Sequence, residues 1–417
     1  MSQQRSIDRP REKIERNAKM KKIFLSRAKG QIARNNTIRD INKQIVLNFV
    51  RARSPISRAD IARETSLQRS TVSSIVDGLQ NAGLIEESGI GNSTGGKKPM
   101  LLRLKAGTPV AIGVDVTPRY TTVAIADLTG SVLQMEKFPT SSDIEYMNEQ
   151  ILAKVEKFVH EYPAADLEVG ISIPGIADQD SGDILYIPYF QWADWDIGKQ
   201  ITKRFNLPVI IDNDANAVAL AELWFGEPLM RSARNFILVL VSEGIGTGII
   251  IDGEVYRGEN GAAGEFGHMF IAEDAAVECS CGRRDCWEAH ASEKAIVNRY
   301  KSKNGKSETD VIDIDHLIDL ARNGERQAQA VLKESAKYLG IGISNLIIGF
   351  SPQAVVVSGR IVRAWELIEG EIQILTQRSI RHELSQTPII PSTLGDEPTI
   401  LGAITLVLAR KFASAGL

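Results

Sequence analysis

The chain has 417 residues, of which 43% are hydrophobic and 24% charged, so it is long enough for two or three domains with sizeable cores. No apolar run approaches the roughly 20 residues that a membrane helix needs, and the N-terminus lacks the apolar core of a signal peptide. Composition therefore excludes an integral membrane protein and predicts a cytoplasmic one.

The net charge of −3 hides an asymmetry along the chain. Residues 1–104 hold 21 Lys and Arg against 9 Asp and Glu, whereas the rest of the chain holds 28 against 43. A basic N-terminal quarter joined to an acidic body predicts a nucleic-acid-binding module in a separate domain. Residues 1–35 are expected to form a basic N-terminal arm, either a frayed helix or a disordered tail.

Residues 36–105 show the periodicity of a small helical domain. Apolar residues recur at helical spacing over 38–50, and Ser54-Pro55 ends that segment. Ser57 is placed to cap a second, short helix. A third helix follows, and its buried face is expected to consist of Val72, Ile75, Val76 and Leu79.

The start of the third helix carries small polar and basic side chains. A recognition helix needs such side chains because its first turns enter the major groove of DNA. The candidate DNA-contacting residues are Gln68, Arg69, Ser70, Thr71, Ser73 and Ser74. Residues 86–104 indicate a β-wing whose tip presents Lys97 and Lys98 to phosphates or the minor groove. We therefore predict a winged helix-turn-helix; a three-helix protein-interaction domain is the alternative.

The body, residues 109–417, alternates strands with helices, which indicates an α/β fold. It opens with a hairpin of two strands, 111–116 and 121–126. Further strands are expected at 167–173, 208–211, 236–241, 249–251, 354–358 and 388–392, and helices at 145–161, 217–224, 293–350 and from 402 onward. The hairpin and the Gly-rich turns, one of them at 243–248, resemble two ribonuclease H-like lobes around a cleft.

All three cysteines of the chain lie within eight residues, and His268 stands eleven residues before the first of them. With Cys279, Cys281 and Cys286 this histidine makes a complete tetrahedral ligand set for Zn²⁺. Four protein ligands leave no position for a reacting water, so we expect a structural metal that staples the loop 268–286. Small buried cysteines are the alternative, and a disulfide would leave one thiol over.

Two glutamates bracket the cysteine cluster, Glu265 before His268 and Glu288 after Cys286. We expect the metal to fix the loop so that both carboxylates and the free ring nitrogen of His268 face one pocket. Carboxylates and an imidazole N–H suit a polyhydroxylated ligand such as a sugar. A solvated carboxylate is the alternative for each glutamate taken singly.

These motifs resemble the ROK family (repressor, open reading frame, kinase) from about residue 38 to the C-terminus. The most specific matches are Glu265-Phe-Gly-His268, Cys279-Ser-Cys281-Gly and Cys286-Trp-Glu288; others are Pro174-Gly175, Asn213-Asp214-Ala215-Asn216, Gly246-Thr247-Gly248 and Leu401-Gly402-Ala403. Asp285 stands where the family usually has Gly, and we expect a local backbone adjustment there. The whole chain resembles the family's winged-helix repressors of sugar metabolism, of which xylose and N-acetylglucosamine repressors are examples.

The resemblance implies a hexokinase-like body with a sugar site. In the family's kinases the residue matching Asp214 is the general base, and the positions matching Asn213, Glu265, His268 and Glu288 contact the sugar. His268 is then expected to serve twice, with one ring nitrogen on zinc and the other N–H toward a sugar hydroxyl.

The nucleotide half departs from the family's kinases, in which Gly-Gly-Thr-Lys follows the aspartate of the first strand. Here Asp115 is followed by Val-Thr-Pro-Arg-Tyr. Pro118 lacks an N–H, and no glycine remains to let the backbone approach a phosphate. Ser358-Gly359 likewise replaces the usual Gly-Gly. The resemblance therefore implies a repressor without kinase activity.

We expect a sugar-responsive transcriptional regulator, a repressor of carbohydrate-metabolism genes. It would bind operator DNA as a homodimer, and a sugar or sugar phosphate would close the cleft and change the operator affinity. An ATP-dependent sugar kinase with an attached DNA-binding domain is the alternative. A zinc-dependent interaction protein without a small ligand is a third hypothesis.

Overall fold

The computed structural model describes residues 35–91, 98–163, 166–178, 182–273, 275, 277–305, 312–377 and 386–413. The chain divides into two compact units: an N-terminal unit, Met1–Lys105 with Lys411–Leu417, and a body, Ala106–Arg410. Residues 1–34 of the expected basic arm and Lys97 of the expected wing tip lie outside the described residues. None of the helices in the described ranges combines the length and the apolar character needed to cross a membrane.

The described part of the N-terminal unit is a winged helix-turn-helix, as the sequence predicts. The Ser57 hydroxyl accepts a hydrogen bond from the Asp60 N–H at 3.2 Å and so caps the second helix, which ends where Ser66 adopts a left-handed backbone. The strands pair in the order β1-β3-β2. The elements are α2 (Asn35–Arg53), β1 (Ile56–Ser57), α3 (Arg58–Thr65), α4 (Arg69–Asn81), β2 (Ile85–Ile90) and β3 (Met100–Leu104).

The core of this unit is the apolar stripe that the periodicity predicts. Val72, Val76 and Leu79 of α4 are fully buried, and Ile75 is nearly so. They pack with residues of the other two helices and the wing, because helices with one apolar face are stable only when that face is covered. The buried side chains from those elements include Val46, Val50, Ile61 and Leu102.

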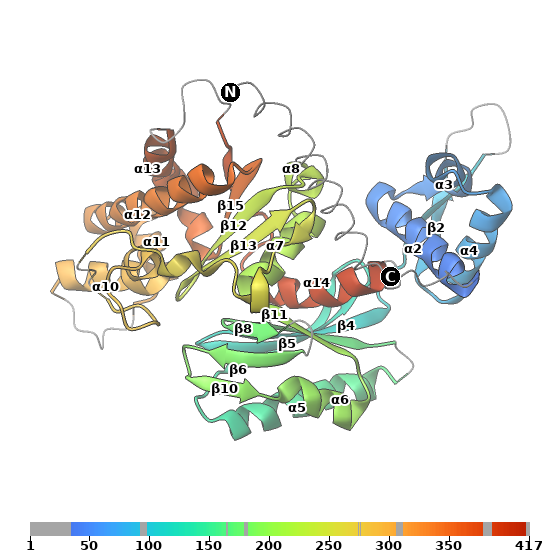
Figure 1. Ribbon diagram of the computed structural model, residues 1–417, viewed down its shortest axis with the longest axis horizontal. Coiled ribbons are helices and arrows are strands. Elements are labelled where there is room, and N and C mark those ends of the chain that lie inside the picture. The colour runs from blue at the N-terminus through green and yellow to red at the C-terminus, as the bar shows by residue number, and fades with distance from the viewer. Residues whose placement is uncertain are drawn as a thin grey trace, which may run out of the picture. The chain divides into compact units, whose positions relative to one another are not determined.

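The first lobe of the body is built on a five-stranded sheet in the order β11-β7-β4-β5-β6. Helices α5 and α6 cover one of its faces (Figure 1). A smaller sheet, β10-β9-β8, extends the lobe toward the second lobe. The elements are β4 (Pro109–Val116), β5 (Tyr120–Asp127), β6 (Val132–Pro139), α5 (Ile144–Glu161), β7 (Glu168–Ile173), β8 (Ile176–Asp178), β9 (Asp183–Ile187), β10 (Trp192–Trp195), α6 (Ile197–Phe205) and β11 (Val209–Asn213).

The second lobe repeats this plan with the sheet β14-β13-β12-β15-β16, one face of which is covered by the helices α10 to α13 (Figure 1). Its strands are β12 (Phe236–Val241), β13 (Ile245–Ile251), β14 (Glu254–Val255), β15 (Ala354–Ser358) and β16 (Ile389–Pro391). Its helices are α7 (Asp214–Phe225), α8 (Pro228–Ser232), α9 (Trp287–Ala291), α10 (Glu293–Lys303), α11 (Ile314–Arg322), α12 (Arg326–Phe350), α13 (Trp365–Gln377) and α14 (Pro398–Phe412). Short 3-10 helices are η1 (Glu259–Gly261), η2 (Glu265–His268) and η3 (Arg360–Ala364).

Helices α7 and α14 form a layer between the two sheets, in contact through glycines. A β-carbon on Gly170 of β7 would lie 2.0 Å from the carbonyl oxygen of Ala403 in α14. One on Gly248 of β13 would lie 2.3 Å from the carbonyl oxygen of Ala215 in α7. Strand backbone thus touches helix backbone on both sides of the layer, which fixes each sheet to the helix that packs on it.

Several sequence-based element boundaries are wrong. Residues 246–248, expected in a turn, lie inside β13 and pair with β12; the connecting turn is 242–244. Their glycines serve the close packing on α7, not a bend. Helix α7 begins at Asp214 instead of 217, because Asn213 caps it. The last helix begins at Pro398, before the Gly402 at which we expected it to start. Strands β6, β8, β9 and β10 and helix α6 were not predicted.

The glycine contact with α14 generates a test of the packing. Gly170→Ala should destabilise the body by about 1–3 kcal/mol, because backbone atoms of α14 cannot move aside independently. Gly370→Ala is the control: this exposed glycine of α13 has open space around it, so alanine should change stability by at most about 1 kcal/mol and in the stabilising direction. Thermal unfolding measures both, and equal melting temperatures for the two variants would contradict the packing argument.

Candidate functional site

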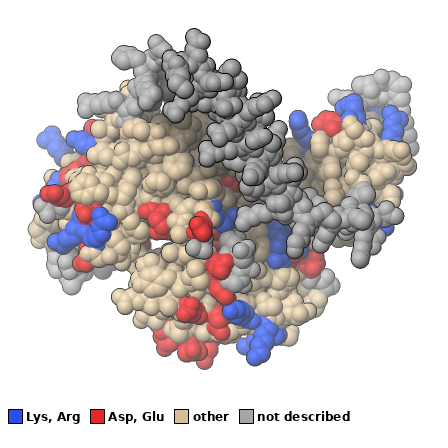
Figure 2. Space-filling view, in the orientation of Figure 1, with Lys and Arg blue, Asp and Glu red and all other residues tan. Residues whose placement is uncertain are grey.

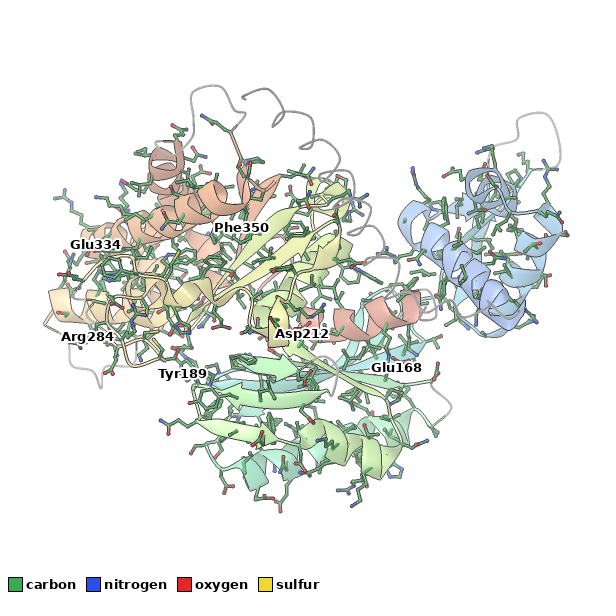
Figure 3. The ribbon with its side chains drawn as sticks, viewed as in Figure 1. Glu168, Tyr189, Asp212, Arg284, Glu334 and Phe350 are labelled. Carbon is green, nitrogen blue, oxygen red and sulfur yellow. The ribbon has the colours of Figure 1, made fainter. Side chains whose placement is uncertain are left out.

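One cavity of the body collects all the residues expected to contact a ligand. Both lobes supply its walls: the ends of β7 and β11 from the first, and the β12–β13 turn, η2 and the start of α9 from the second. Figure 2 shows acidic side chains along the line where the lobes meet, and in Figure 3 Asp212 lies at this junction. The predicted residues that line the cavity are Asn213, Asp214, Glu265, His268 and Glu288.

Asn213 holds the N-terminus of α7 in place. Its Oδ1 accepts hydrogen bonds from the N–H groups of Ala215 at 2.9 Å and Asn216 at 3.3 Å, and its Nδ2 donates to the Gly175 carbonyl at 3.1 Å. The amide therefore has one N–H left for a ligand. The residue is at once a helix cap and a candidate ligand donor.

Asp214 is the first residue of α7, where its Oδ1 accepts the Ala215 N–H at 2.7 Å. Burial, together with the nearby carboxylates of Asp115 and Glu265, raises the pKa of this carboxyl to about 7 against the opposing effect of the backbone hydrogen bonds. The group therefore changes charge near neutral pH. Either a hydrogen-bonding ligand or a proton transfer would use that property.

Arg257, which the sequence analysis missed, supports this site through Asp212 at the end of β11. It follows β14 in the second lobe, and its Nε and Nη2 donate to Asp212 Oδ2 at 2.9 and 2.7 Å. The other oxygen of Asp212, which is almost fully buried, accepts from the Asn213 N–H and from Asn216 Nδ2. The ion pair thus joins the second lobe to the strand end that presents Asn213 and Asp214. No spacing in the sequence relates Arg257 to Asp212, because the contact is purely tertiary.

His268 points in two directions. Its Nδ1 lies 3.1 Å from Cys279 Sγ, and its Nε2 lies 3.5 Å from Glu265 Oε2 beside the cavity. Burial raises the pKa of the Glu265 carboxyl, as does the neighbouring Glu288, while His268 opposes the shift. The 3-10 helix η2 produces this geometry, since it places residues 265 and 268 one turn apart on the same side.

Glu288 ties the cysteine loop to the second sheet. Its Oε1 accepts from the Ser280 N–H at 2.9 Å and from Cys279 Sγ at 3.3 Å, and its Oε2 accepts from the Ile245 N–H at 3.2 Å. A carboxylate has further lone pairs, so it can still accept a ligand hydroxyl. In the structure its carboxylate connects the cysteine loop to β13.

Four side chains converge beside the cavity in an arrangement that could hold a metal ion. The ligand atoms of His268, Cys279, Cys281 and Cys286 all lie within 4.8 Å of one another, and the cysteines form no disulfide. The sulfur atom of Cys281 lies 3.4 Å from that of Cys279 and 3.6 Å from that of Cys286. A tetrahedral ion with bonds of about 2.3 Å to sulfur separates its ligands by about 3.8 Å, so the cluster fits such an ion.

The rest of the loop is anchored to helix α12. Trp287 is fully buried and donates from Nε1 to the Tyr338 carbonyl at 2.9 Å, while His290 stacks on the Tyr338 ring at 4.6 Å. Asp285, where we expected a backbone adjustment, has no positive φ; its side chain instead accepts from Arg283 at 2.9 Å. The described residues between 269 and 286 form little regular structure, so the anchor and the four converging groups define the loop.

The turn after β4 borders a second cavity, lined by Asp115, Pro118 and Arg119 among others. The turn is a tight hairpin, closed by hydrogen bonds between Thr117 and Tyr120. Arg119 Nε pairs with Glu243 Oε1 of the β12–β13 turn at 2.5 Å, so a salt bridge joins the two lobes here. Burial raises the pKa of Asp115 to about 7, and the Thr399 hydroxyl donates to it.

The candidate DNA-reading residues lie on the face of α4 opposite its buried stripe. Gln68, Arg69, Ser70 and Ser74 are exposed, and Thr71 and Ser73 are partly so. Lys98, beside the wing tip, is also exposed. Exposure of the first helical turns is what insertion into a major groove requires.

Comparison with known proteins agrees with this architecture. The profile of the ROK family matches residues 111–410, and that of the MarR family matches residues 45–89. This chain belongs to the ROK family. The xylose repressor of Bacillus subtilis (strain 168) is 33% identical to it over 383 residues, which cover 90% of this chain and 97% of that protein.

Similar solved structures include a transcriptional regulator, which matches most of this chain, and a kinase, which matches a smaller share of it. A ROK family transcriptional regulator, homolog of the Escherichia coli MLC protein, superposes with a TM-score of 0.74 at 27% identity and covers 89% of this chain and 97% of its own. A ROK family glucokinase from Streptomyces griseus, in complex with glucose and AMPPNP, reaches 0.64 at 27% identity and covers 72% of this chain and 98% of its own. The ROK protein described here is thus a DNA-binding transcriptional regulator of the family's repressor branch.

Besides Arg257, sequence reasoning missed Tyr189 and Glu243 as wall residues of the ligand cavity. Tyr189 occupies the tip of the β9–β10 hairpin, which was not predicted. Burial raises the pKa of its phenol, as do the carboxylates of Glu243 and Glu288, so it is a hydrogen-bond donor at neutral pH. A tyrosine between one proline, Pro188, and the aromatic Phe190 offers no sequence pattern that marks it as a site residue.

The converging cysteines generate a test of the metal site. Cys281→Ser should lower bound metal well below one ion per chain and lower the melting temperature, because the loop loses its cross-link. Ser280→Ala leaves the four ligands intact, so this variant should keep the bound metal and the melting temperature of the parent protein. Elemental analysis and thermal unfolding of the purified protein measure the effects. One tightly bound ion per chain in a variant lacking both Cys279 and Cys281 would contradict the assignment.

Proposed function

We propose that a sugar or sugar derivative binds among Asn213, Asp214, Glu265, His268 and Glu288 and controls the operator affinity of the winged helix. The observation that carries this proposal is the convergence of these polar groups on one cavity between the lobes. Their carboxylates accept, and their amide and imidazole donate, as neighbouring sugar hydroxyls require. The full-length similarity to a xylose repressor supports a sugar as effector of a carbohydrate-metabolism repressor.

We propose zinc as the ion of the four-ligand cluster, held by His268, Cys279, Cys281 and Cys286. Three thiolates and an imidazole suit its borderline-soft character, and four protein ligands make the site structural. In the ion's absence, burial and the neighbouring Glu288 raise the pKa of the Cys279 thiol; a dication supplies the charge that a thiolate there needs. With Nδ1 on the metal side, the free Nε2–H of His268 faces Glu265 and the ligand cavity.

The second cavity supports the absence of kinase activity. Seven carboxyl groups and three basic side chains line it, and each base is already paired: Arg119 with Glu243, Lys137 with Glu397, and Arg360 with Glu293. Carboxyl groups outnumber basic side chains in this lining, so the cavity carries an excess of negative charge that repels a triphosphate. Pro118 removes one backbone donor from the turn that would cradle phosphate.

Sugar binding between the lobes would favour the conformation in which both walls contact the ligand, and operator affinity would shift by the difference in ligand affinity between the two conformations. We further propose a homodimer, because two half-sites supply the affinity and spacing that one small winged helix lacks.

The exposed face of α4 generates the first prediction for DNA binding. Arg69→Ala should weaken operator binding by roughly 1–3 kcal/mol if the guanidinium reads a base edge. Lys98→Ala should weaken binding more evenly across sequences and lower the slope of the salt dependence by about 1, because it removes a phosphate contact. Fluorescence anisotropy with operator and scrambled duplexes separates the two effects.

The matched control is Lys203→Ala, which removes an exposed lysine of α6 in the body. It should leave affinity and salt dependence unchanged. The placement of the reading face would be wrong if Arg69→Ala and Lys98→Ala bound operator as tightly as Lys203→Ala does.

Asp214 generates the prediction for the effector site. Asp214→Asn should release operator only at higher sugar concentration, since an amide loses a charge-assisted hydrogen bond commonly worth about 1.5–3 kcal/mol. Affinity for DNA without sugar should stay the same. Asp194→Asn makes the same chemical change at an exposed position outside both cavities, where its left-handed backbone also tolerates Asn, and should respond to sugar normally.

The pKa of about 7 for Asp214 adds a pH dependence. If the carboxylate accepts a sugar hydroxyl, binding favours the ionised form, so effector affinity should rise from about pH 6 to pH 8 and then level off. Asp214→Asn should flatten that rise.

Glu265→Gln should also raise the sugar concentration needed to release the operator. A parent protein that phosphorylates sugar with ATP, and loses that activity in Asp214→Asn, would establish the kinase instead.

A further inference from the structure

The ligand cavity does not end at the five proposed sugar contacts. A second space, which we call the distal hollow, is lined by residues of both lobes and shares Pro188, Tyr189, Glu243, Ser280 and Glu288 with it. The distal hollow has a volume of about 220 Å³, against about 100 Å³ for the ligand cavity itself. The two spaces therefore adjoin each other along these shared residues. Room for a further ligand group therefore lies beside the proposed sugar contacts.

The wall from the first lobe is held rigidly. It is the β9–β10 hairpin tip, where Phe190 stacks on Trp192 at 4.5 Å and Trp192 donates from Nε1 to the Ser142 carbonyl at 3.1 Å. This packing leaves Tyr189, which is 36% exposed as a residue, and Gln191 on the cleft side. Figure 3 shows Tyr189 at the edge of the first lobe that faces the second. An aromatic face beside an amide suits a sugar ring, which has apolar C–H faces and a polar edge.

The wall from the second lobe consists of the cysteine loop and the start of α10. Val277 is buried, whereas Glu278, Ser280 and Lys294 expose their side chains. Lys294 Nζ donates to the Glu278 carbonyl at 3.3 Å, which holds the ammonium beside the hollow. Donors and acceptors are therefore spread around the space, and no cluster of bases is present among the described lining residues.

The charge of this wall discriminates between ligand classes. Glu243, Glu278 and Glu288 contribute three carboxylates to the lining, and Lys294 is the single basic group among the described lining residues. A phosphate or carboxylate substituent would meet a negative environment there, whereas the hydroxyls of a neutral sugar unit would find acceptors and donors.

We propose that the effector is a neutral disaccharide or longer oligosaccharide, with one unit among the five proposed contacts and the next unit past Tyr189 in the distal hollow. This inference rests on the proposed sugar-sensing function. A two-unit ligand contacts the hairpin tip of one lobe and the cysteine loop of the other, so the second unit adds to the force that closes the cleft. Gln191 and Lys294 then determine specificity for the second sugar unit, because they line the distal hollow and do not line the ligand cavity.

The test is isothermal titration of the full-length protein with matched pairs: xylose and xylobiose, glucose and cellobiose, N-acetylglucosamine and chitobiose, together with glucose 6-phosphate. One disaccharide should bind about tenfold or more tightly than its own monosaccharide, as two added hydrogen bonds imply. Lys294→Ala and Gln191→Ala should weaken that disaccharide several-fold and leave the monosaccharide unchanged. Lys203→Ala, outside both spaces, should alter neither.

The outcomes separate this inference from the function on which it rests. A monosaccharide that binds and releases operator while no disaccharide binds more tightly overturns the distal subsite alone. The same holds if glucose 6-phosphate binds most tightly, or if Lys294→Ala and Gln191→Ala weaken both ligand lengths equally. If no sugar of either length binds or releases operator, the sugar-sensing proposal itself fails.

Discussion

Helix α7 packs on β13 so closely that Gly248 has no room for a β-carbon, which would lie 2.3 Å from the Ala215 carbonyl oxygen. The same helix carries Asn213 as its cap and Asp214 as its first residue. Packing of the helix therefore sets the position of two ligand-cavity residues. On the other side of the layer, Gly170 of the first sheet is in similarly close contact with α14. The cavity lies at the end of a rigid layer, and its geometry follows from the contacts within that layer.

The opposite wall of the cavity has much less regular structure and is held by different forces. Between η2 and α9 the chain relies on the converging ligand groups, on buried Trp287, and on Glu288. The Glu288 carboxylate binds the Ser280 N–H on one side and the Ile245 N–H on the other, so the cysteine loop is attached to the second sheet at the cavity. A cross-linking ion is a natural way to order a segment that forms few backbone ladders.

Regulators and kinases of this family share one scaffold, and the difference here lies at the turns where the lobes face each other. Here the hairpin around Pro118 is closed by its own hydrogen bonds, and the Arg119–Glu243 ion pair joins the two lobes beside it. The cavity that we propose as the sugar site keeps its polar groups, because sensing requires only binding. Under the proposed function, one part of the cleft is a ligand site, while the neighbouring turns form a contact between the lobes.

The amino-acid sequence by itself determined the local elements and the chemistry of the short-range motifs. The Val72–Leu79 stripe and the Ser57 cap follow from periodicity and capping, and the histidine–cysteine set follows from ligand types at close spacing. Tertiary structure alone decided the rest. Gly246 and Gly248 looked like a turn, because a sequence does not distinguish a glycine that bends the chain from one that admits a helix. Arg257 and Tyr189 reach the site across long separations, and only the folded packing of both lobes brings them there.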